Sequence, residues 1–322
     1  MAPRLGPRVW LALATIYVVW GSTFMAVTIA VRDLPPLMSM AIRHVAAGLI
    51  LLAWALPRGN GSADPVGRRQ IVAGFVFGGA LFLGGHGLLA WAQQTVPSSV
   101  AALLIGSIPL WMALLDRVCF GKRLHRAANL GLVGGFVGLA FLLDPFGTGS
   151  VDRTGAVVAL LAALAWAAGS LYARGAPLPR RPLVAGGLGA LSGGILLWIS
   201  AALAGELGDA RFTADALLAV VYLIVVGTLI GFTAYVWLLR VAPTSLVSTY
   251  AYVNPIVAVV LGWALLGEDV TAQMLVAGGA IIVSVALILR TSGAALAPGR
   301  GLLRRPRAHS RRVAAEGAAS RS

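Results

Sequence analysis

The residues that could do chemistry in this chain are few, and they stand inside long apolar runs. Arg43 and His44 are adjacent in one run, and His86 lies in the next. An arginine can hold a carboxylate through two parallel hydrogen bonds, and histidine exchanges protons near neutral pH. Each also has a structural alternative: Arg43 could cap carbonyls of a neighbouring helix or reach the outer interface, and either histidine could join two helices by a hydrogen bond.

A second polar group interrupts an apolar run in the stretch STYAYVNPIV, which begins at Ser248. At helical spacing Tyr250 and Asn254 share one face, and Ser248 and Tyr252 share another. Pro255 follows, and a proline removes one backbone hydrogen bond of a helix. Two polar faces are too many for a helix surrounded by lipid. The stretch therefore predicts contact with a cavity and a substrate.

The composition places these residues in an all-α integral membrane protein. Of the 322 residues, 59% are hydrophobic and 11% charged, and the mean hydropathy is +0.88. Soluble domains carry roughly 25% charged residues, and a membrane-spanning helix needs about 20 apolar residues. The predicted spans are 9–31, 36–56, 71–92, 98–118, 128–144, 154–173, 183–204, 217–239, 246–266 and 272–289. The first is too long for the apolar core of a signal peptide.

The positions of the charges predict the orientation of these spans. Cytoplasmic loops of membrane proteins retain lysine and arginine. With the N-terminus inside, every basic residue falls on the cytoplasmic side except Arg32, Arg43, Arg153 and Arg211, and most acids fall outside. We therefore expect a multi-pass protein of the cytoplasmic membrane with both termini in the cytoplasm.

The chain also repeats itself. Ala90–Leu143 aligns without a gap on Val236–Leu289, and the same register pairs Trp20 with Trp166. Because each half holds five spans, the second half must enter the membrane with the opposite polarity, which is an inverted-topology repeat of the kind found in secondary transporters. The expected organisation is ten transmembrane helices: a first five-helix repeat at 1–144, an external linker at 145–153, a second five-helix repeat at 154–290 and a tail at 291–322.

Two pairs of repeat mates lie near the middle of their spans. Pro109 and Pro255 each free a backbone carbonyl, which is tolerated at membrane depth only against protein or a water-filled cavity. We interpret them as hinges. Trp20 and Trp166 lie far from the interfaces where tryptophan gathers in membrane proteins. They indicate aromatic walls of a central cavity, with ordinary core packing as the alternative.

No motif for a cofactor, a metal or an enzymatic reaction is found. A phosphate-binding loop is absent, and the dinucleotide-like pattern GHGLLA, which starts at Gly85, lies inside a predicted span. Cys119 is the only cysteine, which excludes an intramolecular disulfide and a multi-cysteine metal site. The basic residues form no face interleaved with aromatics, so we expect no nucleic-acid partner.

The lipid bilayer is the first expected partner of the chain. The basic tail at 291–322 has no periodic apolar face, which predicts a disordered cytoplasmic segment. Its arginines could attract anionic lipids or could serve topology alone. Small-residue pairs such as Gly74/Gly78 and Gly131/Gly135 allow close helix packing, either within one chain or across a homodimer.

Four stretches carry a family resemblance: YVVWGSTFMAV, PPLMSMAIRHVAAG, VPSSVAALLIGSIPLW and APTSLVSTYAYVNPIVAVVLGWALLGE. Together and in this order, over residues 9–290, the chain resembles the EamA family of the drug/metabolite transporter superfamily. The resemblance implies a ten-helix inverted-repeat fold with a central cavity and the export of small metabolites or amphipathic compounds. The family often has an acid after the glycine that ends the fourth span. Here Lys122 follows Gly121, whereas Glu268 follows Gly267.

These observations favour a secondary transporter, without enzymatic activity, that exports a small amino-acid-like or drug-like molecule by alternating access. An uptake permease and a non-transporting membrane scaffold are the alternatives, because the sequence records neither gradients nor a coupling ion. The hinges are Pro109 and Pro255. The expected substrate-binding residues are Trp20, Thr23, Arg43, His44, His86, Trp166, Tyr250, Tyr252 and Asn254.

Overall fold

The computed structural model describes residues 6–58, 66–143 and 151–296, and within that range the regular structure is entirely helical. Most of the predicted linker and the tail from residue 297 onward lie outside the described residues. The elements are α1 (Pro7–Ala30), α2 (Pro36–Ala55), η1 (Leu56–Arg58), α3 (Arg68–Gly78), η2 (Gly79–Gly87), α4 (Leu88–Ala92), α5 (Ser98–Ile105), α6 (Ile108–Phe120), α7 (Arg126–Leu142), α8 (Arg153–Ala173), α9 (Pro182–Leu203), η3 (Glu206–Gly208), α10 (Ala214–Tyr222), η4 (Leu223–Ile230), α11 (Gly231–Val241), α12 (Thr244–Val247), α13 (Tyr250–Leu266) and α14 (Ala272–Leu296).

Eight helical stretches in the described residues are long and apolar enough to cross a membrane, and each coincides with a predicted span. Two shorter apolar helices, Arg126–Leu142 and Tyr250–Leu266, fall where the fifth and ninth spans are predicted. The third and eighth spans each contain a π-helical segment, η2 and η4, between two α-helices. Helix α14 extends to Leu296, six residues into the segment predicted as the tail.

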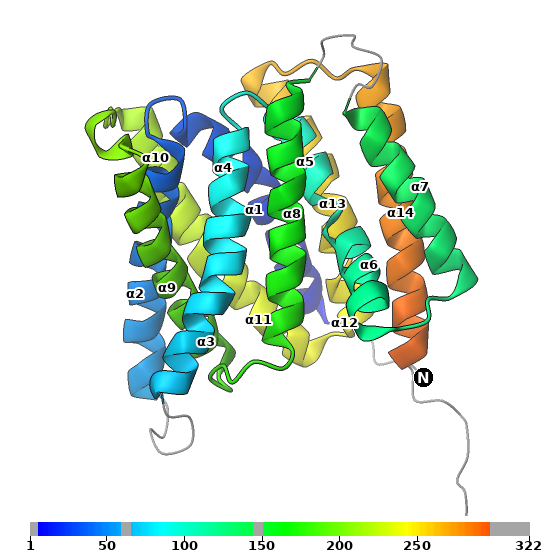
Figure 1. Ribbon diagram of the computed structural model, residues 1–322, viewed down its shortest axis with the longest axis horizontal. Coiled ribbons are helices and arrows are strands. Elements are labelled where there is room, and N and C mark those ends of the chain that lie inside the picture. Colours follow the sequence, from blue (N-terminus) through cyan, green and yellow to red (C-terminus); the bar gives the residue numbers. More distant parts are fainter. Residues whose placement is uncertain (1–5, 59–65, 144–150, 297–322) are drawn as a thin grey trace, which may run out of the picture.

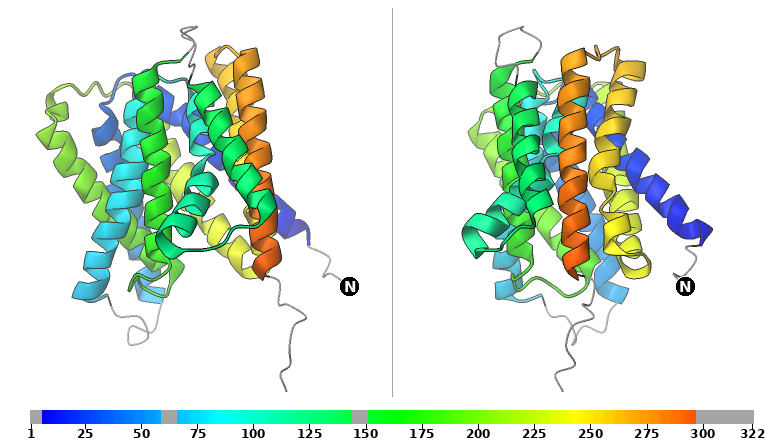
Figure 2. Two further views of the ribbon diagram at one scale, coloured as in Figure 1. Left: turned by 45° about the vertical axis from the view of Figure 1, so that its right-hand side comes forward. Right: turned by 90° about the vertical axis from the view of Figure 1, so that its right-hand side faces the viewer.

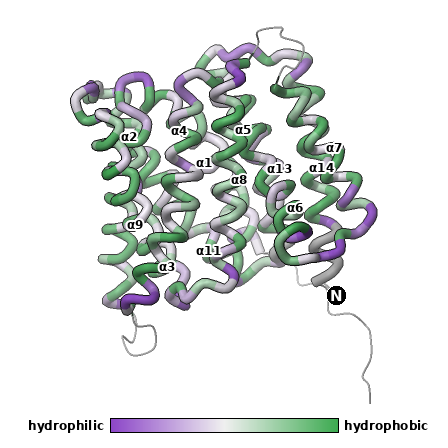
Figure 3. The backbone as a smooth tube through the Cα atoms, viewed as in Figure 1, coloured by the Kyte–Doolittle hydropathy of each residue, from purple (hydrophilic) through white to green (hydrophobic). Residues whose placement is uncertain are grey.

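The outer surface of the bundle is apolar, as a lipid environment requires. Large hydrophobic side chains such as Leu11, Leu130 and Leu203 are exposed on it. Figure 3 shows hydrophobic residues along the lengths of the helices and hydrophilic residues gathered at the two ends of the bundle. The beginning of α1 and the end of α14 lie at the same end (Figures 1 and 2).

Glycines bring several of these helices into backbone contact inside the chain. Lipid supplies no hydrophobic drive between helices, so small residues that allow close approach are the expected contact points. A Cβ on Gly78 of α3 would lie 2.3 Å from the Gly189 carbonyl oxygen of α9. One on Gly131 of α7 would lie 2.8 Å from the Ser284 carbonyl oxygen of α14. The small-residue pairs singled out in the sequence therefore serve packing within the chain.

Repeat mates share local geometry as well as residue type. Gly121 and Gly267 each end a helix in the left-handed region, with φ of 63° and 68°. The residue after each donates its N–H back into the helix: Lys122 to the Asp116 carbonyl at 3.2 Å and Glu268 to the Gly262 carbonyl at 3.0 Å. These bonds satisfy carbonyls that the helix end would otherwise leave open. The largest helix contacts, α2 with α9 and α7 with α14, also join repeat mates.

The two mid-span prolines do not interrupt their spans in the same way. Pro109 is the second residue of α6, just after the break that separates α6 from α5. Proline is tolerated in a first helical turn because that N–H has no partner there. Pro255 instead lies inside the continuous helix α13, and the break in that span falls earlier, between α12 and α13. A Cβ on Gly106, at the first break, would lie 3.0 Å from Pro255 Cγ, so the break packs against the second proline.

Candidate functional site

A cluster of three aromatic rings lies between α1, α11 and α13. The centroid of the Trp20 ring lies 5.2 Å from that of Tyr235 and 5.0 Å from that of Tyr250, and the two tyrosines are 5.8 Å apart. Tilted and edge-to-face contacts of this kind are the favourable arrangements for aromatic pairs. Trp20 Nε1 also donates a hydrogen bond to the carbonyl of Gly227 at 3.2 Å.

Tyr235 was not among the predicted site residues, although a signal for it exists. Its repeat mate is Leu89, so the side chain is polar only in the second half of the chain. The same comparison distinguishes Tyr250, whose repeat mate is Leu104.

A second cluster joins α2, η2 and α8. His86 Nδ1 and His44 Nε2 are 2.8 Å apart, and the two rings are stacked with an interplanar angle of 9°. Trp166 lies 4.9 Å from the His86 ring, and Phe82 lies 4.4 Å from the His44 ring. The structure thus brings together three predicted site residues, His44, His86 and Trp166, and adds Phe82. The other ring nitrogen of His44, Nδ1, is buried without a partner.

The two tryptophans occupy equivalent places in the two halves. A Cβ on Gly231 would lie 2.5 Å from Trp20 Nε1, and one on Gly85 would lie 2.8 Å from Trp166 Cε3. Gly85 and Gly231 are themselves repeat mates, so each indole lies on the glycine backbone of a span from the other half. The glycines lie in or beside η2 and η4, and π-helical turns are frequent at functional sites.

Arg43 lies at the edge of the first cluster and is 5% exposed. Its Nε donates to Thr228 Oγ1 of η4 at 3.2 Å, and its Nη1 lies 4.0 Å from Met40 Sδ. The position that a Cβ on Gly227 would occupy is 3.5 Å from Arg43 Nη2 and 3.0 Å from Thr23 Cγ2. Three of the predicted site residues, Thr23, Arg43 and Trp20, therefore lie beside one segment, η4.

Tyr252 and Asn254 lie apart from this centre. Asn254 is buried between α13 and α1, and its amide nitrogen can donate to the carbonyls of Tyr17 at 3.3 Å and Tyr250 at 3.2 Å. Tyr252 packs against an apolar cluster that includes residues of α5, α7 and α14, whereas Tyr250 packs with residues of α1 and α11. Asn254 thus joins two helices in this structure, and substrate contact at either residue stays a prediction.

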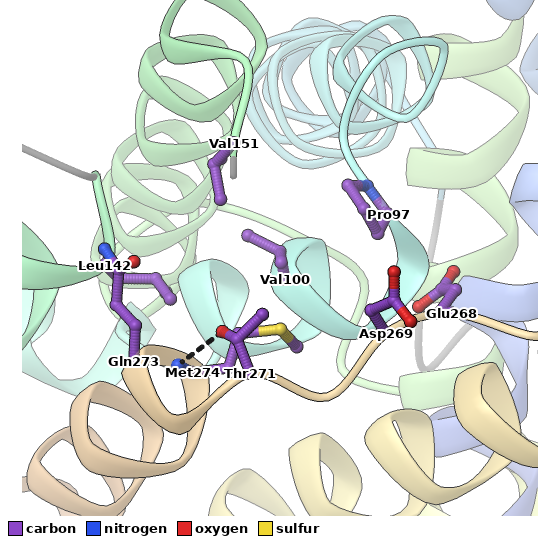
Figure 4. Close-up of a pocket in the computed structure, with 9 residues that line it drawn as sticks. All are labelled: Pro97, Val100, Leu142, Val151, Glu268, Asp269, Thr271, Gln273 and Met274. Atoms are coloured by element: carbon purple, nitrogen blue, oxygen red, sulfur yellow. Dashed lines mark hydrogen bonds between the residues drawn. The ribbon is translucent and has the colours of Figure 1, made fainter. Parts of the chain in front are cut away.

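A carboxylate seals the contact between α13 and α5 at the end of the bundle away from the beginning of α1. Glu268 Oε1 accepts the N–H of Ser98 at 2.7 Å, and Oε2 accepts that of Ser99 at 2.9 Å. The first N–H groups of a helix lack partners within the helix and attract negative charge. Beside this seal lies a pocket of about 230 Å³. Figure 4 shows Glu268 next to Pro97, with Asp269 and Val100 also on the wall.

The equivalent contact at the other end is built differently. Lys122, the repeat mate of Glu268, is paired with Asp116 at 2.9 Å, and Arg174 contacts the same carboxylate at 3.0 Å. A lysine cannot accept hydrogen bonds from the start of a helix. The exchange of an acid for a lysine after Gly121 therefore gives the two ends of the bundle different helix-end contacts.

The fold and its centre describe a multi-spanning α-helical membrane protein with aromatic, histidine and arginine side chains inside the bundle. Residues 8–144 and again 153–290 match the EamA-like transporter family, and the chain belongs to that family. It is 35% identical to the uncharacterized inner membrane transporter YedA of Escherichia coli (strain K12), over 86% of this chain and 89% of that protein. Protein PecM of Dickeya dadantii (strain 3937) is 26% identical over 84% of this chain and 88% of its own length.

A solved crystal structure shares the fold. It superposes with a TM-score of 0.59 at 20% sequence identity and covers 88% of this chain and 97% of the other. The family and the named relatives identify this protein as a membrane transporter.

Proposed function

We propose that the protein is a secondary transporter that exports small metabolites or amphipathic compounds across the cytoplasmic membrane by alternating access. The observation that carries this proposal is the crossed arrangement of the two tryptophans. Trp20 of the first half lies on Gly231 of the second, and Trp166 of the second half lies on Gly85 of the first. Transporters with inverted repeats place their substrate at such an interface between halves.

The same proposal includes two inverted five-helix repeats with both termini in the cytoplasm. Its support is the shared glycine geometry at the ends of α6 and α13, the double family match and the position of α1 and α14 at one end of the bundle. The beginning of α3, which starts at Arg68, and the end of α6, which Lys122 follows, lie toward that end as well, in agreement with the preference of cytoplasmic loops for basic residues. Export is favoured over uptake by the family resemblance.

Access to the centre can be tested by labelling single cysteines. The background is Cys119→Ser, which removes the only native cysteine. In this background Thr23→Cys should react with a water-soluble maleimide, because alternating access exposes the centre to water in each cycle. Val18→Cys is the matched control, since Val18 lies on the same helix, is 56% exposed and falls within a predicted membrane span. Equal, negligible labelling at both positions would support a non-transporting scaffold.

Transport itself can be tested in proteoliposomes. The purified protein should catalyse saturable flux of at least one member of a panel of amino acids, nucleosides and amphipathic drugs, measured with and without a proton gradient. Tyr250→Phe and Trp20→Ala should reduce that flux in protein that remains monodisperse. A panel that gives no flux, together with unlabelled Thr23→Cys, contradicts the proposed function. If the protein moves substrate only toward the side of the vesicle membrane that corresponds to the cytoplasm, it is an uptake transporter and the proposed export is wrong.

A further inference from the structure

Arg43 is the one arginine, lysine, aspartate or glutamate among the described residues whose side chain is buried. The described acids stand in loops, in short turns or at helix ends, and Asp116, near the end of α6, is already paired with Lys122 and Arg174. A lone charge at membrane depth is costly, and in membrane proteins it is normally compensated by a partner or a ligand. No carboxylate among the described residues compensates Arg43.

The hydrogen bonds of Arg43 also leave most of its donors free. A guanidinium has five N–H donors. One binds Thr228 Oγ1, and one points at a sulfur 4.0 Å away, which is a weak acceptor. No backbone carbonyl receives a hydrogen bond from Arg43 in the part of the chain that the structure describes, and the side chain is buried. The two structural roles considered for this residue, carbonyl capping and reach to the interface, are therefore not the ones it has here.

Nη2 of Arg43 lies beside a glycine. Gly227 has no side chain, and a Cβ there would come within 3.5 Å of Nη2. Trp20 donates a hydrogen bond to the carbonyl of the same glycine, so its indole lies next to this position. The His44–His86 hydrogen bond, 2.8 Å long, requires one ring nitrogen to accept, so at least one of these two histidines is neutral. The fixed charge of this region is positive.

We propose that the transported substrate is an organic monoanion whose compact anionic group, such as a carboxylate, binds the free N–H groups of Arg43 beside Gly227, with its apolar body against Trp20. This inference rests on the proposed transport function and adds the charge class of the substrate. Arginine holds a carboxylate through parallel N–H bonds that a neutral amide cannot replace and that an amine opposes. The bound anion supplies the partner that the chain itself does not.

An anionic substrate also supplies a driving force for export. Each elementary charge that crosses a potential of 100 mV gains enough free energy for a concentration ratio of about fiftyfold. Because the cell interior is negative, a monoanion moves outward down this gradient without a coupling ion. The absence of a described carboxylate from the membrane-depth portions of the helices fits such a transporter, since protons and sodium are usually carried by acids there.

The charge class can be tested with matched probe sets and the purified full-length protein. Each set holds one carboxylate, its primary amide and its amine: phenylacetate, phenylacetamide and phenethylamine, and likewise hexanoate, hexanamide and hexylamine. Retention is measured by equilibrium dialysis and mass spectrometry. We expect retention of a carboxylate at least tenfold above its amide and amine, and loss of that retention in Arg43→Gln. Arg32→Gln, which removes an exposed arginine at the end of α1, should bind like the wild type.

A second variant keeps the charge and fills the space beside it. Gly227→Ala places a methyl group next to Nη2, and pairing it with Thr23→Ser removes the methyl that would stand 3.0 Å away. This double variant should fold, keep Arg43 and still lose carboxylate retention, whereas Gly279→Ala, which adds a methyl group in open space on α14, should retain it. In proteoliposomes, efflux of the retained carboxylate should speed up when a valinomycin-imposed potential makes the interior negative.

The outcomes separate this inference from the proposed function. Retention or flux of amines or amides with no preference for carboxylates overturns the anion proposal and leaves a transporter. Undiminished carboxylate retention by Arg43→Gln, or retention of no carboxylate at all, overturns it too. Only the lack of any flux and of labelling at Thr23→Cys contradicts the transport function itself.

Discussion

Replacing Glu268 by glutamine should weaken the contact between α13 and α5 and open that end of the bundle to water more often. The carboxylate accepts two N–H groups of the first turn of α5, at 2.7 and 2.9 Å. A side-chain cap is worth about 0.5–2 kcal/mol, and bonds to an ionised acceptor are stronger than neutral ones. Glutamine keeps one acceptor oxygen but presents an NH₂ in place of the other and loses the charge. Because Glu268 is half-exposed and screened by water, we expect a loss of about 1.4 kcal/mol, or about tenfold in the ratio of sealed to open molecules.

The assay is the rate at which an added membrane-impermeant maleimide labels Thr23→Cys from outside right-side-out vesicles, in the Cys119→Ser background. Glu268→Gln should raise this rate about tenfold. Asp269→Asn is the matched control, because it removes the same charge at the next, exposed position, where the structure shows no hydrogen bond. If the two variants label alike, or if Glu268→Gln labels at the wild-type rate, the seal does not limit access and the reasoning is wrong.

Two further variants test local structure. Gly267→Ala places a Cβ on a residue in the left-handed region, at φ 68°, and should lower the stability by about 1–2 kcal/mol. The measurement is the thermal midpoint in detergent. Gly279→Ala, in open space on α14, is the control and should be neutral or slightly stabilising. Hydrogen bonds from Gly155 N–H and Thr95 Oγ1 lower the pKa of Asp152, so its stabilising effect is present above the ordinary carboxyl pKa of about 4 and is lost as the pH falls through the depressed value. The difference in thermal midpoint between the wild type and Asp152→Asn should be constant from pH 7 to about 4 and shrink below it; a difference that grows in acid contradicts this.

The positions of the spans were predictable because apolar length is a strong one-dimensional signal. Each of the eight long apolar helices lies on a predicted segment, and the two shorter helices lie where the fifth and ninth were placed. Backbone irregularities were harder to predict. Pro109 and Pro255 looked equivalent in the sequence, yet only the first follows a break directly, because a proline in a first turn and a proline inside a helix meet different carbonyls. The π-helical segments η2 and η4 were not predicted, because apolar length and periodicity do not distinguish a π-helix from an α-helix.

The structure brings several of the predicted site residues together, and their role in substrate binding stays a prediction. Trp20, Thr23 and Arg43 converge on η4, and His44, His86 and Trp166 form one cluster, as residues at membrane depth on different spans were expected to do. The periodicity of a single helix could not tell which polar face meets the centre. Tyr250 and Asn254 share a face by spacing. The amide nitrogen of Asn254 nevertheless donates to the backbone carbonyls of Tyr17 and Tyr250, because α1 packs closely against α13. Only the neighbouring helix decides that outcome.

The differences between repeat mates carry more information about function than their likenesses. The likenesses, such as Gly121 with Gly267 and the two tryptophans on their glycines, build a frame that both halves need. A frame with identical ends would favour neither side of the membrane. Here Glu268 closes one end by accepting N–H groups of α5, whereas Lys122 at the other end is bound to Asp116 and cannot do the same for α12. Exchanging the two, as Glu268→Lys with Lys122→Glu, should therefore move the preferred opening to the other face, and labelling of Thr23→Cys from each side would measure it. Unchanged sidedness would show that the resting conformation is set elsewhere in the bundle.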